Sequence, residues 1–262
     1  MKVLITNDDG VHAQGIIELA KRVRQHAEVF VVAPQVEQSG VSQAITFLEP
    51  LFAKSLGGDW DSQDDQIPGF SVNGTPVDCV KLGVNELAPW KPDLVLSGIN
   101  GGLNCGVNVC YSGTVGGALA ASTYGIPAIA ISLESAESMN FARAAELAWP
   151  MIERFQNLKL PTRTALNINF PTASLDGNAE TKFVPVETNP MGFHFDKGID
   201  PKGRNYFWAT NNPPPQPSGH ETDTQSLLAG HVTVSAISYD LNQPVALAEL
   251  ADAERNILDD QV

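Results

Sequence analysis

Val3-Leu4-Ile5-Thr6-Asn7-Asp8-Asp9-Gly10 contains the pattern from which the fold can be predicted. A run of apolar and β-branched residues stops at two adjacent carboxylates and a glycine, and apolar residues at helical spacing follow from about Gln14. This order of strand, acidic turn and helix is typical of α/β proteins, which bind ligands at the carboxyl ends of their strands. We therefore expect an α/β fold with a candidate site directly after the first strand.

The two adjacent carboxylates, Asp8 and Asp9, indicate a bound cation. Neighbouring aspartates repel each other, so keeping both ionised in a folded turn normally requires a compensating positive charge. Hard oxygen ligands of this type suit Mg²⁺, Mn²⁺ or Ca²⁺ better than Zn²⁺. The alternative is a solvated turn, because Asn, Asp and Gly are also ordinary turn residues.

Strands and helices continue to alternate along the first 170 residues. Buried strands are expected at residues 28–34, 93–97, 127–133 and 165–170, and helices from Gln14, over 76–88, before Gly125 and over 139–155. Strands as apolar as 28–34 are typical of parallel sheets that are covered by helices on both faces. The pattern predicts a Rossmann-like three-layer α/β sandwich with a mostly parallel sheet.

The sequence is less regular from residue 171 onward. We expect residues 1–170 to form the core that carries the site, and 171–262 to form an irregular β-rich extension and a terminal helix within the same domain. Strand-like runs at 181–187 and 231–239 are separated by Gly- and Pro-rich segments, so they should pack on the main sheet or on another chain. The polar segment 54–69 is expected to be a surface excursion, and 246–258 an acidic amphipathic helix.

Charge and composition exclude several classes of function. The net charge of −14 over 262 residues argues against binding to a nucleic-acid polymer or to an anionic membrane. Three cysteines are an odd number, and Cys105 and Cys110 lack zinc-site partners, so buried structural thiols in a reducing compartment are expected. Since no apolar run approaches membrane-spanning length, we expect a soluble cytoplasmic protein.

Familiar catalytic motifs are missing. Gly10 to Gly15 has the glycine spacing of a P-loop, but Ile16-Ile17 stands where Lys and Ser/Thr are required. Neither a dinucleotide fingerprint after a strand nor the serine elbow of α/β-hydrolases occurs. The five histidines show no paired zinc spacing, and only His12, three residues after Asp9, is a candidate for the site.

Ser112-Gly113-Thr114 opens the alanine-rich helix that precedes Gly125. Hydroxyls and a glycine at a helix amino end can bind an anion through free backbone N–H groups and the helix dipole. The alternative is ordinary capping, with small residues that allow close packing of the helix on the sheet.

Five blocks of sequence, in order, resemble the SurE survival-protein family of metal-dependent nucleotidases. They are Asn7-Asp8-Asp9-Gly10-Val11-His12-Ala13, Val32-Ala33-Pro34 with Ser39-Gly40, Gly74-Thr75-Pro76-Val77-Asp78-Cys79-Val80, Ser97-Gly98-Ile99-Asn100-Gly101-Gly102-Leu103-Asn104 and Tyr111-Ser112-Gly113-Thr114-Val115. Weaker similarity continues at 221–224 and 230–234. The segment 54–69 is longer than in the family and 191–217 matches poorly, which leaves substrate preference open.

The resemblance implies a divalent-metal phosphomonoesterase that hydrolyses nucleoside 5′-monophosphates, with 3′-monophosphates left open. It implies one Mg²⁺ or Mn²⁺ per subunit, and the ligands are expected to be Asp8, Asp9, Ser39 and Asn100. The phosphate would be bound by Asn104, Ser112, Gly113 and Thr114, and the catalytic residues would be Asp8, Asp9 and His12. It also implies homodimers or homotetramers that exchange C-terminal segments.

Two alternatives to this function remain open. The same site could hydrolyse other small phosphate esters or short polyphosphate. The chain could also be a non-catalytic regulator that binds a nucleotide or a metal.

Overall fold

A computed structural model describes residues 1–57, 60, 67–190, 193–211 and 219–259. One sheet of nine strands dominates the fold, in the order β3-β4-β2-β1-β5-β6-β7-β11-β8. The strands are β1 Lys2–Thr6, β2 Glu28–Pro34, β3 Ala53–Ser55, β4 Gly69–Val72, β5 Leu94–Gly101, β6 Ala128–Leu133, β7 Thr164–Phe170, β8 Thr181–Phe183 and β11 Val232–Ser238. Within this sheet, β3 with β4 and β7 with β11 are antiparallel and the other neighbours are parallel.

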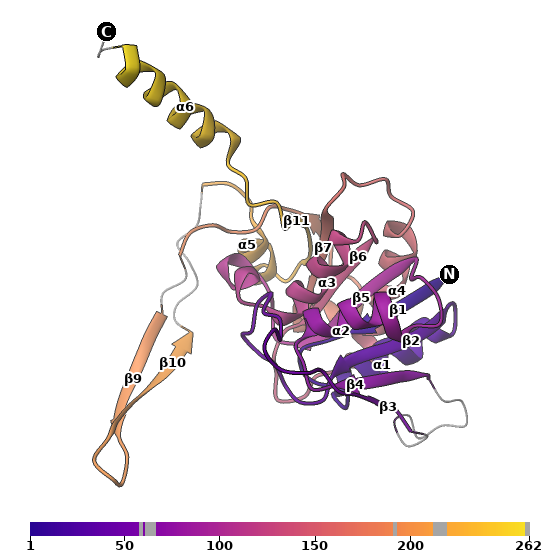
Figure 1. Cartoon of the computed structure of the whole chain (residues 1–262). Coiled ribbons are helices and arrows are strands. Elements are labelled where there is room, and N and C mark those ends of the chain that lie inside the picture. Colours follow the sequence, from indigo (N-terminus) through magenta and orange to yellow (C-terminus); the bar gives the residue numbers. More distant parts are fainter. Residues whose placement is uncertain (58–59, 61–66, 191–192, 212–218, 260–262) are drawn as a thin grey trace.

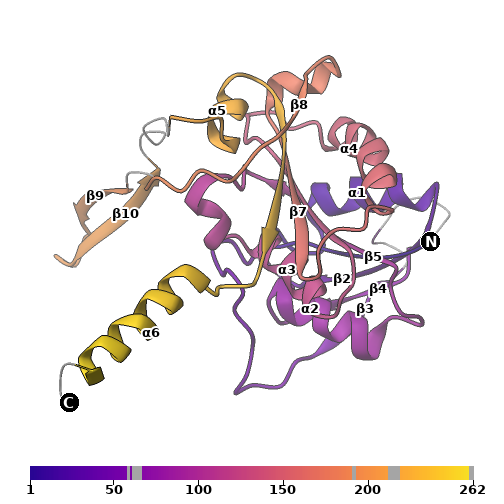
Figure 2. The same ribbon diagram turned by 90° about the horizontal axis from the view of Figure 1, so that it is seen from above.

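Helices cover both faces of the sheet, which confirms the predicted three-layer α/β sandwich (Figure 1 and Figure 2). One core joins the sheet to α1 Gln14–Arg24 and α4 Phe141–Phe155. The other core joins it to α2 Pro76–Leu82 and α3 Gly113–Thr123. The shorter helices are the π-helix η1 Gly83–Leu87, the 3₁₀ helices η2 Gly106–Cys110 and η3 Thr172–Asp176, and α5 Asp223–Leu228.

Local sequence explains where these helices begin. Thr75 caps α2, since its hydroxyl accepts from the Asp78 N–H at 3.1 Å while the Asp78 carboxylate accepts from the Thr75 N–H at 3.0 Å. Such a capping box satisfies two N–H groups that the helix leaves without a partner. At Gly15 of α1 a Cβ atom would lie 1.9 Å from the carbonyl oxygen of Ile99, so glycine allows the helix to pack closely on β5. The acidic turn before α1 is thereby held next to β5.

Strand β5 is longer than the sequence predicted. The sequence indicated a strand that ends at Ser97 and a loop of small residues after it. In the structure β5 continues to Gly101, because Asn100 and Gly101 pair with Ser132 and Leu133 of β6 after an irregularity in register. The backbone at Asn100 is therefore part of the sheet and not of a loop.

The C-terminal half partly follows the prediction. Strands β8 and β11 join the main sheet, as expected, but β8 ends at Phe183, well before residue 187. A hairpin of β9 Phe193–Ile199 and β10 Asn205–Asn211 was not predicted. This hairpin and the terminal helix α6 Pro244–Asp259 project away from the sheet (Figure 1 and Figure 2).

Two sequence interpretations need correction. Cys79 and Cys105 are buried free thiols as expected, but Cys110, at the end of η2, is exposed. Half of the predicted surface excursion 54–69 lies outside the described residues, yet Trp60 and Ile67 are buried in the core. The Trp60 indole N–H donates to the carbonyl of Val11 at 2.7 Å, which ties this segment to the chain just after the acidic turn. None of the helices in the described ranges is long and apolar enough to span a membrane.

Candidate functional site

The candidate site lies at the carboxyl ends of β1 and β5, which are neighbours in register through Thr6 and Ser97. Asp8 and Asp9 follow β1 directly, and Asn100 lies near the end of β5. The loop after β2 carries Ser39 to the same edge, because the Gln38 N–H donates to the backbone carbonyl of Asp8 at 2.7 Å. The four predicted metal ligands thus come from three segments that meet at one edge of the sheet.

Asp8 is the most buried acid of the site, with 4% of its surface exposed. The Thr114 hydroxyl donates a short hydrogen bond to its Oδ1. A Cβ atom on Gly113 would lie 2.8 Å from the Asp8 Cβ, so only glycine lets the amino end of α3 come this close. Burial raises the pKa of Asp8 to about 6, and although the hydrogen bonds from Thr114 lower it, repulsion from Asp9 adds to the rise.

Asp9 is held by the neighbouring strand. Its Oδ2 accepts the Gly101 N–H of β5 at 3.0 Å. Burial raises the pKa of Asp9, the hydrogen bond from Gly101 lowers it, and the negative charge of Glu37 raises it further. Glu37 was missed in the sequence, where its position two residues before Ser39 is the only signal.

The neutral candidates present oxygen atoms as well. The Ser39 hydroxyl donates to Glu37 Oε1 at 2.7 Å, which leaves its lone pairs as the ligating group. The Asn100 amide nitrogen donates to the carbonyl of Gly102 at 2.7 Å, so its Oδ1 is the end that can ligate a cation.

This donor set fits a hard divalent cation. No Lys, Arg or His in the described part of the chain forms an ion pair with Asp8 or Asp9, although two acids sit side by side at a buried edge. Over the same residues no cluster of three or more His, Cys, Asp or Glu forms a metal site. The candidate shell is therefore mixed, with two carboxylates and two neutral oxygens.

The remaining predicted residues occupy different surroundings. His12 is exposed, and within the described ranges it forms neither a hydrogen bond nor an ion pair with Asp8 or Asp9. The Ser112 hydroxyl accepts the Val115 N–H at 3.0 Å, so it caps α3 as the alternative interpretation expected. Asn104 is buried and its side-chain amide donates to Ser132 at 2.9 Å. The phosphate-binding role of Asn104, Ser112, Gly113 and Thr114 stays a prediction, as does the catalytic role of His12.

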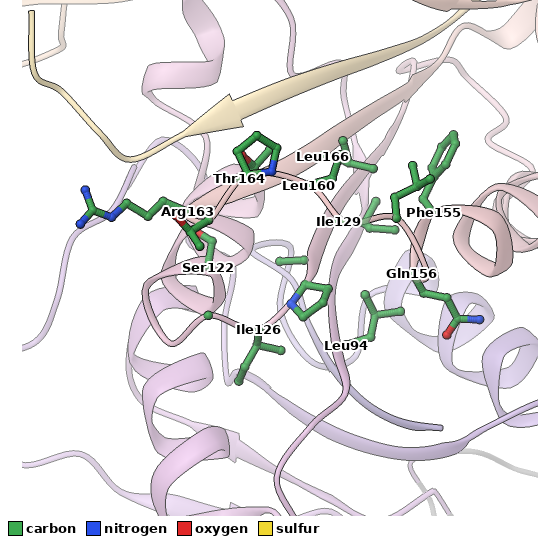
Figure 3. Close-up of a pocket in the computed structure, with 16 residues that line it drawn as sticks. Leu94, Ser122, Ile126, Ile129, Phe155, Gln156, Leu160, Arg163, Thr164 and Leu166 are labelled. Atoms are coloured by element: carbon green, nitrogen blue, oxygen red, sulfur yellow. The ribbon is translucent and has the colours of Figure 1, made fainter. Parts of the chain in front are cut away.

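A pocket lies at the amino ends of three central strands (Figure 3). Its lining includes Leu94, Ala128 and Thr164, which begin β5, β6 and β7, and its volume is about 160 Å³. Of the described residues that line it, only Arg163 is charged. Because it is mostly apolar and lies at the amino ends of the strands, it lacks the groups that phosphate chemistry requires.

Comparisons with known proteins show which proteins this chain is similar to. A sequence profile described as Survival protein SurE matches residues 3–191. A 5′-nucleotidase SurE from Rhodopirellula baltica is 40% identical over 96% of this chain and 98% of its own. One from Citrifermentans bemidjiense is 41% identical over 97% of this chain and 99% of its own. The crystal structure of the Sure protein from Aquifex aeolicus superimposes with a TM-score of 0.82 at 32% identity, covering 97% of this chain and 100% of that one.

The raised pKa of Asp8 predicts how the stability of the metal-free protein depends on pH. The pKa of Asp8 is higher in the folded protein than in the unfolded chain. The stability that the protonated Asp8 carboxyl contributes to the fold is therefore fully present below a pH of about 4 and is lost as the pH rises through about 6. Relative to Asp8→Asn, the EDTA-treated protein should lose about 3 kcal/mol of unfolding free energy between roughly pH 4 and 7. Urea denaturation of both proteins across this range measures it, and parallel pH profiles would contradict the burial of a titrating Asp8.

The Thr114 hydroxyl predicts a second pH effect. A hydrogen bond to a charged group contributes about 1.5–3 kcal/mol, so Thr114→Val should raise the Asp8 pKa further and let protons compete with the metal. Apparent Mn²⁺ affinity should fall about two- to tenfold at a pH of about 7 and recover by about pH 9. Thr114→Ser, which keeps the hydroxyl, is the control. Unchanged Mn²⁺ affinity with a lower kcat/KM would instead place Thr114 on the phosphate.

Proposed function

This chain belongs to the Survival protein SurE family, and on that premise we propose that it is a divalent-metal-dependent 5′-nucleotidase. The reaction is hydrolysis of nucleoside 5′-monophosphates to nucleoside and phosphate. The observation that carries the proposal is the pair Asp8 and Asp9 at the carboxyl ends of the strands. Within the described residues neither acid forms an ion pair with Lys, Arg or His, and Ser39 and Asn100 offer further oxygen atoms as ligands. The relatives named 5′-nucleotidase cover nearly the whole chain and supply the substrate class.

In this proposal Asp8, Asp9, Ser39 and Asn100 hold one Mg²⁺ or Mn²⁺. When bound, such an ion neutralises phosphate charge and lowers the pKa of a bound water. The amino end of α3 adjoins Asp8, so its backbone N–H groups and dipole favour the phosphate at the same place. Phosphoryl transfer asks chiefly for positioning and charge stabilisation, which this arrangement offers without a covalent nucleophile.

Three residues are candidates for the general base that takes a proton from the attacking water. Asp8 and Asp9 are candidates because both have a raised pKa, and His12 is a candidate because it is exposed at the start of α1, beside the acidic turn. A His12→Gln variant with lower kcat at unchanged metal affinity would assign the role to His12.

Two other functions would use the same groups. A phosphatase for other small phosphate esters or short polyphosphate needs the same cation and the same helix end. A non-catalytic regulator would bind metal or nucleotide without turnover. Hydrolysis of nucleoside 3′-monophosphates would also use these groups.

We place the protein in the cytoplasm, because its three cysteines are free, as in a reducing compartment.

Phosphate release from a panel of 5′- and 3′-monophosphates, phosphate esters and polyphosphate, with Mg²⁺, Mn²⁺ or EDTA, tests these functions. Asp8→Asn should abolish turnover and leave the fold intact, because it removes an anionic ligand and also the repulsion in the metal-free turn. Ser39→Ala and Asn100→Ala should retain activity but require more metal, since neutral ligands attract the ion less. Wild-type turnover by Asp8→Asn at saturating metal would refute the ligand assignment.

We also propose a homodimer or homotetramer built through the C-terminal region. The hairpin β9–β10 exposes Phe207 and Trp208, and α6 exposes Val245, Leu247 and Leu250. Apolar side chains grouped on projecting elements are typical of an interface with another chain.

Light scattering tests this assembly. The full chain should exceed the monomer mass of 28.0 kDa at micromolar concentration. Ending the chain after Leu241, which removes α6, should weaken association. Mn²⁺ affinity should stay within about twofold, since β1 and β5 at the candidate site are separated in the sheet from β11, which precedes α6, by β6 and β7. A monomeric full-length protein would refute the proposal, and loss of metal binding with α6 would show that the site depends on it.

A further inference from the structure

A row of polar side chains crosses the sheet from the candidate site into the C-terminal half. Register places Asn100 of β5 beside Ser132 of β6, Ser132 beside Asn169 of β7, and Asn169 beside Thr233 of β11. Ser132, Asn169 and Thr233 are fully buried. Central strands of this kind usually bury apolar residues on both faces, and burying polar groups without partners is costly. Polar residues at these buried positions are therefore expected to have a specific role.

Two members of this row, Ser132 and Asn169, form hydrogen bonds with Asn104. Its backbone N–H donates to Asn169 Oδ1 at 2.8 Å, and its carbonyl accepts from Asn169 Nδ2 at 3.0 Å. Asn167 Nδ2 donates to the same carbonyl at 2.7 Å, and the Asn104 side chain donates to Ser132 at 2.9 Å. Asn104 follows the end of β5, and in the described part of the chain it forms no hydrogen bond with another backbone group. The side chain of Asn169 therefore takes the place of a neighbouring peptide group.

Fixing Asn104 also fixes the three residues between it and Asn100. Within them, the Gly102 carbonyl accepts from the Asn100 amide nitrogen and so sets the direction of the Asn100 oxygen. The Gly101 N–H donates to Asp9. Two of the four candidate ligands are thus oriented by backbone groups of one short segment, whose far end is held by Asn169.

The segment is held again two residues later. Asp223 of α5, fully buried, accepts the Gly106 N–H at 3.0 Å and the Glu187 N–H at 2.8 Å. This second anchor also belongs to the C-terminal half of the chain. Asn169 nevertheless holds the residue nearer to Asn100 along the chain, and among the described residues it alone binds both backbone groups of Asn104.

We propose that Asn169 is a positioning residue for the divalent cation. Its hydrogen bonds to both backbone groups of Asn104 fix the segment that orients Asn100 and Asp9, although Asn169 itself is not a ligand. This role rests on the proposed function, because it takes Asp8, Asp9, Ser39 and Asn100 as the ligands. Second-layer residues that orient ligands commonly change metal affinity by about 10- to 100-fold when they are replaced.

The test is Mn²⁺ binding to the substrate-free full chain, measured by electron paramagnetic resonance and by calorimetry. Asn169→Leu removes both hydrogen bonds at similar volume and should weaken Mn²⁺ binding about tenfold or more. Because nucleotide is left out of this measurement, the loss reports on the metal site and not on the phosphate-binding role predicted for Asn104. Asn169→Ser is the milder variant, with an expected loss of Mn²⁺ affinity of about three- to tenfold. This variant provides the test if Asn169→Leu does not fold.

Two controls separate positioning from general destabilisation. Thr233→Val lies in the same row and replaces a buried hydroxyl that has no hydrogen-bond partner, so Mn²⁺ affinity should stay within about twofold. Ile168→Ala opens a cavity beside Asn169 in the core that contains α1 and α4, and should lower the melting temperature without a comparable loss of Mn²⁺ affinity.

The outcomes distinguish this proposal from the proposed function. If wild type binds Mn²⁺, Asp8→Asn does not, and the Asn169 variants bind like wild type, the positioning role is wrong and the metal site stands. The positioning role is also wrong if Ile168→Ala weakens binding as much as Asn169→Leu does. If wild type itself does not bind Mn²⁺, the proposed function fails first.

Discussion

Repulsion between two neighbouring carboxylates at the end of β1 is the constraint on which the rest of this structure depends. Asp8 and Asp9 are adjacent in sequence, and burial makes their charges more costly than in water. Two hydrogen-bond donors stabilise these charges: the Thr114 hydroxyl at the start of α3 donates to Asp8, and the Gly101 N–H of β5 donates to Asp9. Among the described residues no Lys, Arg or His forms an ion pair with either acid, and this is the observation behind the proposed cation.

This constraint explains why small residues line the site. The amino end of α3 can approach Asp8 only because residue 113 has no side chain, and α1 can lie against β5 only because residue 15 has none. Both contacts bring helix ends and strand ends to one edge of the sheet. The helix dipole and the candidate ligands consequently act on the same small volume, as expected at the carboxyl edge of a parallel sheet.

The C-terminal half supports the site from outside it. Strand β7 supplies Asn169 to the segment after β5, and α5 supplies Asp223 to the start of η2. The family profile ends at residue 191, but the buried Asp223 shows that the part beyond it is packed into the same body. The hairpin β9–β10 and α6, in contrast, project away from the sheet (Figure 2), and they expose apolar side chains.

The sequence by itself determined the features that depend on near neighbours along the chain. The acidic turn at Asp8 and Asp9 was predicted from neighbouring residues, and the cap at Ser112 was one of the two interpretations of that helix start. The capping box at Thr75 also joins residues only three positions apart. Apolar runs predicted the central strands for the same reason. The hairpin β9–β10 was missed, because polar and apolar residues are mixed in its strands and it contributes little to a core.

Only the tertiary structure decided which groups surround the acids. Thr114 and Asp8 are 106 residues apart, Asn104 and Asn169 are 65 apart, and Trp60 and Val11 are 49 apart. No local pattern encodes such pairs, because they depend on strand order, on the register between β5, β6 and β7, and on how closely α3 packs. The alternating Asn167 and Asn169 of β7 were visible in the sequence, but their partner became identifiable only when the sheet placed Asn104 above them.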